Sequence, residues 1–95
     1  RTPRGASITG RVTNASPGYR LRDMTLLLRL HDCPSADTPR DQCPVIGESR
    51  AIARPDVPPS QIRAFTAHFG FVGVPPVVGR LDWDLAIVET RATAN

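Results

Sequence analysis

The chain has 95 residues, of which 40% are hydrophobic and 22% charged. This length supports one hydrophobic core and this composition is too apolar for a disordered chain, so we expect a single domain over residues 1–95. No apolar run approaches the ~18 residues of a membrane helix. Because the chain begins at Arg1 rather than at methionine, we expect residues 1–5 to be a flexible lead, where a removed signal peptide or membrane anchor would have been attached.

The formal net charge is +3, and all twelve basic residues are arginine. Nucleic-acid-binding proteins concentrate their basic side chains on one surface, whereas these arginines are dispersed from Arg1 to Arg91. The dispersion favours codon usage in a GC-rich genome as the cause. We therefore expect no nucleic-acid partner.

The first third of the chain predicts two β-strands. Ile8, Gly10 and Val12 alternate with polar residues and precede turn-forming residues 14–18. A longer strand is expected over residues 21–31, with an apolar face made of Met24, Leu26, Leu28 and Leu30. Since Leu21 is out of phase with that face, we expect a β-bulge within residues 22–24.

Two cysteines follow the second predicted strand. A disulfide between Cys33 and Cys43 would close a loop rich in Pro, Ser and Asp. On the loop-entropy account it would contribute about 3 kcal/mol, and it implies a periplasmic or extracellular location. Free or redox-active thiols remain an alternative. So does a metal site made of His31, Cys33, Cys43 and His68, although this spacing lacks the CxxC and HxxxH patterns of zinc sites.

The rest of the chain predicts further strands. Weak alternation over residues 45–53 is followed by a proline-rich break at 54–60, and a strand is expected over 61–68. The last strand is predicted from the alternation of Leu81, Trp83, Leu85 and Ile87, which places Trp83 in the core. Ten prolines and seven glycines leave little room for helices. We therefore expect an all-β antiparallel sandwich of five main strands, or six to seven with short additions.

Candidate catalytic residues are few. Asp82 and Asp84 share one face of a strand at about 6 to 7 Å, a separation found in paired-carboxylate catalysis but also on any solvated strand. The sequence contains no G-x-S-x-G, G-x-G-x-x-G or P-loop pattern. The N-glycosylation pattern at residues 14–16 is interpreted as a turn. We expect neither an enzyme nor a cofactor.

The connection at residues 69–79 is almost wholly apolar, whereas loops are usually polar, so something should cover it. Phe71, Val74 and Val77 could fold under the sandwich as a core plug. Alternatively the connection contacts a protein partner or a bilayer surface. The residues expected to contact that partner are Phe69, Phe71, Val72, Val74, Pro75, Pro76, Val77 and Val78.

The expected number of strands also predicts where the loops lie. If five strands alternate in direction, the N-terminus and the loops at 33–43 and 70–79 lie at one end, and the turns at 14–18 and 54–60 lie at the other. An anchor before Arg1 would then direct both loops toward a membrane or an anchored partner.

Several segments resemble the FxLYD-type immunoglobulin-like domains of bacterial cell-envelope proteins. They are Ile8–Asn14, Leu26–Cys33, Ile46–Glu48, Val57–Phe65 and Gly79–Trp83. The resemblance spans Ile8 to Thr90, although the eponymous Phe-x-Leu-Tyr-Asp pattern is absent. It implies an extracytoplasmic immunoglobulin-like sandwich, often tethered to a membrane, with no common catalytic residues.

Together these features predict a non-catalytic interaction module, acting as an accessory or stabilising subunit of a membrane-associated complex. It would dock through the 70–79 loop and the adjacent disulfide loop. The alternative is a periplasmic metal- or thiol-handling protein that uses His31, Cys33, Cys43 and His68.

Overall fold

The computed structural model describes residues 4–95, which fold into five β-strands and one short 3-10 helix. The elements are β1 (Gly5–Thr13), β2 (Tyr19–Cys33), η1 (Arg40–Gln42), β3 (Val45–Ala53), β4 (Ile62–Gly70) and β5 (Arg80–Ala94). No α-helix occurs within the described residues, which confirms the predicted all-β class. None of their helical segments has the length and apolarity needed to cross a membrane.

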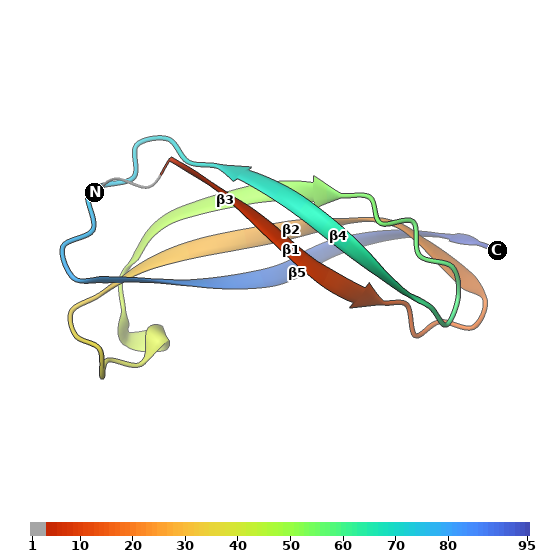
Figure 1. The fold of residues 1–95 in the computed structure, drawn as a ribbon, viewed down its shortest axis with the longest axis horizontal. Coiled ribbons are helices and arrows are strands. Elements are labelled where there is room, and N and C mark those ends of the chain that lie inside the picture. The colour runs from red at the N-terminus through yellow and green to blue at the C-terminus, as the bar shows by residue number, and fades with distance from the viewer. Residues whose placement is uncertain (1–3) are drawn as a thin grey trace.

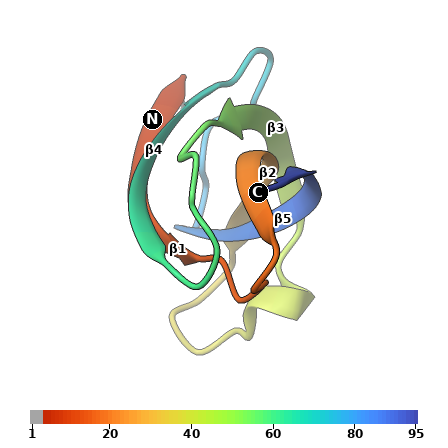
Figure 2. The ribbon, with the colours of Figure 1, turned by 90° about the vertical axis from the view of Figure 1, so that its right-hand side faces the viewer.

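The strands form two antiparallel sheets (Figure 1), one of β1 and β4 and one in the order β3-β2-β5. β1 pairs with β4 along its whole length, from Gly5 opposite Gly70 to Thr13 opposite Ile62. In the other sheet β2 is the central strand and pairs with both neighbours. Figure 2 shows the two sheets as separate layers.

The predicted arrangement of loops is confirmed. The start of β1, the disulfide loop and the 70–79 loop lie together at one end, and the two turns lie at the other (Figure 1). At the first end the Phe71 N–H donates to the Arg4 carbonyl, and at the second the Ser60 N–H donates to the Ser16 carbonyl. Of the expected flexible lead, Gly5 is the first residue of β1 and Arg4 precedes the strand. Residues 1–3 of that lead lie outside the described residues.

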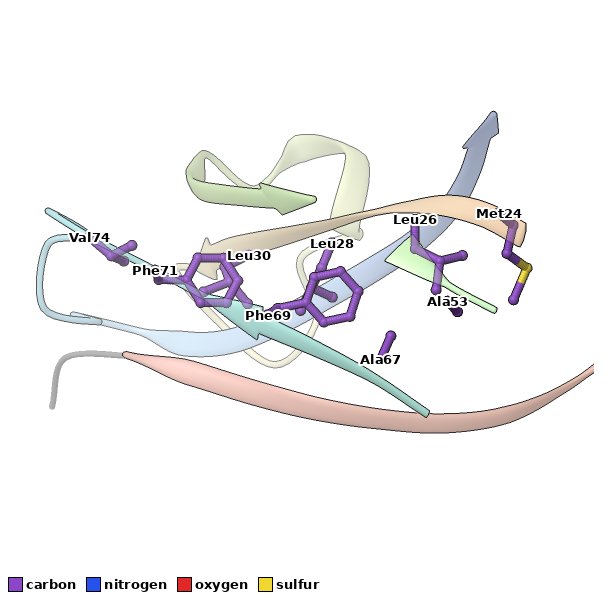
Figure 3. Packing of buried hydrophobic residues seen from close by; sticks show 9 residues of the cluster. All are labelled: Met24, Leu26, Leu28, Leu30, Ala53, Ala67, Phe69, Phe71 and Val74. Carbon is purple, nitrogen blue, oxygen red and sulfur yellow. The ribbon is translucent and has the colours of Figure 1, made fainter. Parts of the chain in front are cut away.

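The hydrophobic core lies between the two sheets (Figure 3). Its buried members are Met24, Leu26, Leu28 and Leu30 of β2, with Ala53, Ala67, Phe69, Phe71 and Val74. The apolar face predicted for β2 is therefore the core face. The β2–β5 register shifts between Leu21 and Asp23, so the predicted bulge is present. A second shift leaves Val88 of β5 out of register.

The apolar face of β5 differs from its prediction. Trp83 lies opposite Leu30 and Ile87 lies opposite Leu26, so both are on the inner face. Their exposed fractions are nevertheless 49% and 53%, and the predicted burial of Trp83 is wrong. The reason is topological, because the opposing sheet has two strands and β4 lies close to β3 rather than to β5. On the inner face of β5, Leu85 packs against the core, whereas Trp83 and Ile87 on either side of it remain about half-exposed.

Candidate docking surface

A groove of about 230 Å³ opens beside Leu81 and Trp83 on this face. It is lined by residues 5–8 of β1, Leu28 and Leu30 of β2, Phe71, and Leu81 and Trp83 of β5. The Ser7 hydroxyl and the indole N–H of Trp83 are the only polar side-chain groups among these residues. The groove can therefore accommodate apolar side chains, and its chemistry offers nothing to activate a substrate.

The 70–79 loop contributes Phe71 to the groove and combines the two alternatives considered from the sequence. Phe71 and Val74 are buried, so the core-plug explanation is correct for them, while Val77 is half-buried. Val72 and Val78 are 99% and 93% exposed. Pro75 and Pro76 are also exposed. We call these four exposed apolar side chains the crest, and the buried side chains of Phe71 and Val74 the plug.

The structure changes which residues of this loop can contact a partner. Phe69 and Val74 face the core, so including them among the partner-contacting residues is wrong. Phe71 also belongs to the core, and only the part that lines the groove is open to a partner. The accessible residues of the loop are those of the crest, with Val77 at its margin.

Asp32 fixes the 70–79 loop to the end of β2. Its carboxylate accepts hydrogen bonds from the backbone N–H groups of Val78, at 2.9 Å, and Gly79, at 2.8 Å. A Cβ at Gly79 would lie 2.1 Å from the Cys33 carbonyl oxygen, so only glycine fits this approach. The loop is therefore held in place next to the disulfide.

The disulfide between Cys33 and Cys43 is formed, with a Cα–Cα distance of 4.7 Å, as predicted. The loop that it closes is tied to β5 by two side-chain contacts. Arg40 Nε lies 3.3 Å from Asp82 Oδ2. His31 of β2 connects the loop to β5, because its Nδ1 lies 3.3 Å from the Cys43 carbonyl oxygen and its Nε2 lies 2.5 Å from Asp84 Oδ2. The disulfide loop thus braces β5.

Asp82 and Asp84 therefore have structural partners rather than a catalytic arrangement. Asp82 pairs with Arg40 and also lies 3.6 Å from Arg80, while Asp84 contacts His31. The Trp83 backbone N–H, followed by the Arg40 guanidinium, holds the pKa of the Asp82 carboxyl below its usual value. Ion pairing keeps this carboxyl charged, which does not suit a general acid.

The four residues of the alternative metal or thiol site are not brought together. Both cysteines are consumed by the disulfide, so the free-thiol prediction is wrong. His31 faces Asp84, whereas His68 lies on β4 of the other sheet, where its Nδ1 is 2.8 Å from Ser7 Oγ. Within residues 4–95 no group of three metal-ligating side chains forms.

The segment at residues 14–16 is a turn, as interpreted from the sequence. The buried Asn14 side chain donates to the carbonyls of Tyr19 and Val57 and accepts from the Ser16 N–H. These bonds stabilise the turns at the end of the molecule that is distant from the groove.

Comparison with protein-family models, curated proteins and solved structures found no match for this chain. The resemblance to the FxLYD-type domains accordingly remains a prediction.

Proposed function

We propose that this protein is a non-catalytic, extracytoplasmic interaction module with an immunoglobulin-like sandwich fold, and that a protein partner docks on the groove between β1 and β5. The observation that carries this proposal is the half-exposed Trp83 on the inner face of β5, which lines an apolar groove. The resemblance to cell-envelope domains supports the finer proposal that the partner belongs to a membrane-associated complex. The disulfide is consistent with a location outside the cytoplasm.

The energetic argument is that this face is apolar and exposes large side chains. Leu81, Trp83 and Ile87 are all more than two-fifths exposed on one face of β5, with Leu81 next to Trp83 and the partly buried Leu85 between Trp83 and Ile87. Burial of apolar surface contributes roughly 25 cal/mol per Å², and exposed contiguous patches of this kind mark interaction sites. Tryptophan is also enriched among the residues that dominate binding at protein interfaces.

The loops beside the groove support the same proposal. The crest residues Val72 and Val78 add exposed apolar side chains in the loop that leads into β5. Asp32 and the disulfide hold the surrounding backbone in place. A surface that is ordered before binding loses less conformational entropy on association.

Site-specific photocrosslinking in the cells that produce the protein tests this function. A photoreactive residue at Leu81 or Val72 should give an adduct with one and the same protein. Arg50 is the control position, because it is exposed and lies opposite Leu27 on the outer face of the three-stranded sheet. Adducts of equal yield from all three positions, or none from Leu81 and Val72, would refute the proposal.

A further inference from the structure

The strand β1 has one free edge, and that edge borders the groove. Within the described residues β1 pairs only with β4. The Arg4 carbonyl accepts from Phe71, and the Asn14 N–H donates to Gln61, so even-numbered residues direct their backbone groups toward β4. In an uninterrupted antiparallel ladder the odd-numbered residues then direct theirs away from β4. Ser7, Thr9 and Arg11 therefore present backbone donors and acceptors to the open edge.

The groove lies where an additional strand beside β1 would place its inward side chains. Residues 5–8 form one wall, and Leu81 and Trp83 form the other. A strand hydrogen-bonded to β1 would run about 4.8 Å from it, in front of the inner face of β5. Because side chains of a strand alternate, every second residue of the added strand would enter the groove and should be apolar.

The charge of the β1–β4 sheet indicates which outward side chains an added strand should carry. Residues 4–22 and 57–81, which contain both strands of the β1–β4 sheet, include no aspartate or glutamate. Arg11 is exposed on the outer face of this sheet, and no ion pair found among the described residues includes it or Arg63. The outward side chains of an added strand would lie next to Arg11, where acidic residues are favoured.

Building on the proposed function, we infer that the partner contributes an extended segment that adds a strand to the free edge of β1, with alternating apolar and acidic side chains. The apolar side chains fill the groove and the acidic ones face Arg11. This inference gives the partner a stated chemistry, since the backbone of β1 supplies the hydrogen bonds and the groove supplies the side-chain selection.

Two other occupants fit this surface less well. A second copy that paired its own β1 with this edge would place two strands of the same charge side by side, which is unfavourable. A bilayer surface would cover the apolar face, but it would leave the free backbone groups of β1 without partners, which is costly in lipid. An acidic, extended peptide would hydrogen-bond to the free backbone groups of β1 and would also pair with the positive charge of Arg11.

The test uses synthetic peptides of about eight residues and the emission of Trp83, the only tryptophan of the chain. A peptide alternating valine with glutamate should shift the emission to shorter wavelength as it buries the indole, and a peptide alternating valine with lysine should bind at least about tenfold more weakly. Thr9→Pro removes a free-edge N–H and should weaken binding by about tenfold relative to Thr9→Ala. Arg11→Glu should reverse the preference between the two peptides, which keeps the test decisive if Thr9→Pro does not fold.

Several outcomes would overturn strand addition. They are equal binding of both peptides, an unchanged preference in Arg11→Glu, or a concentration-dependent emission shift without peptide, which would indicate a second copy. A partner that crosslinks to Leu81 but binds Thr9→Pro and Thr9→Ala equally well would preserve the docking function and refute only the added strand. No crosslink at Leu81 together with no peptide binding would refute both.

Discussion

The two edge strands of the three-stranded sheet, β3 and β5, present opposite kinds of inner face to the core. Where β3 lies opposite Met24, Leu26, Leu28 and Leu30, its inner residues are Ala53, Ala51, Ser49 and Gly47. The matching residues of β5 are Thr90, Ile87, Leu85 and Trp83. The inner side chains of β3, which β4 approaches, are small, whereas those of β5, which lies farther from β4, are mostly large. The difference indicates that the β3 flank is complete by itself and that the β5 flank is built to receive additional apolar groups.

The largest expected difference between these flanks concerns stability. Leu26→Ala removes a fully buried side chain and should lower the free energy of unfolding by about 2 to 5 kcal/mol. Ile87→Ala truncates its half-exposed cross-strand neighbour and should lower it by less than about 1 kcal/mol. Urea denaturation without reductant measures both. Equal losses would mean that the β5 flank is covered after all.

Removing the Cys33–Cys43 disulfide tests how much it stabilises the end of the molecule that both flanks share. Replacing Cys33 and Cys43 together by serine should destabilise the fold by about 3 kcal/mol, because the unfolded chain is no longer cross-linked. Denaturation midpoints of this variant and of the oxidised protein provide the comparison. Adding reductant should lower the midpoint of the oxidised protein and leave that of the double variant unchanged. A midpoint insensitive to both changes would contradict a stabilising disulfide.

A smaller effect should appear at the covered flank. A Cβ at Gly47 would lie 2.8 Å from Cγ2 of Val74, so Gly47→Ala should displace the plug and lower stability by roughly 1 to 3 kcal/mol. Gly18→Ala is the matched control, because no atom lies within 4 Å of its added Cβ. Thermal unfolding distinguishes the two variants. If Gly47→Ala were as stable as Gly18→Ala, the close packing of Val74 against β3 would be refuted.

The smallest effect concerns pH. The folded state lowers the pKa of Asp82 below its ordinary value of 3.8, mainly through the Trp83 N–H and Arg40. The stability from this carboxylate is therefore present above pH 3.8 and is lost as pH falls through the lower folded-state value. Asp82→Asn should reduce the loss of stability on acidification, as measured by unfolding between pH 6 and 2. The pKa of Asp56 is also lowered, chiefly by Arg20, so Asp56→Asn should show the same kind of pH effect at the opposite end of the molecule.

Much of the fold could be predicted from the sequence, because strand alternation and turn residues are local signals. The core face of β2, its bulge and the grouping of the loops at one end all follow from such signals. The exposure of Trp83 could not be predicted this way. Alternation identifies the face on which a side chain lies, but burial depends on how five strands divide into sheets of two and three.

The candidate site was predicted only in part for the same reason. The apolar composition of the 70–79 loop correctly marked an unusual segment, but its division into plug and crest depends on tertiary contacts. The groove was not predicted, since its walls come from residues 5–8 and from Trp83, more than seventy positions apart. The small inner residues of β3 and the large ones of β5, which pair with the same residues of β2 from opposite sides, are a usable signal once the strand register is known.

The attachment of the 70–79 loop through Asp32 has a consequence for how this surface can evolve. Asp32 binds two backbone N–H groups, and the close approach beside Cys33 requires only that residue 79 be glycine. Neither contact uses the side chains at Val72, Pro75, Pro76 or Val78. Mutations can therefore vary the crest while its backbone keeps the same place, and related chains can diverge in partner specificity without rebuilding the scaffold.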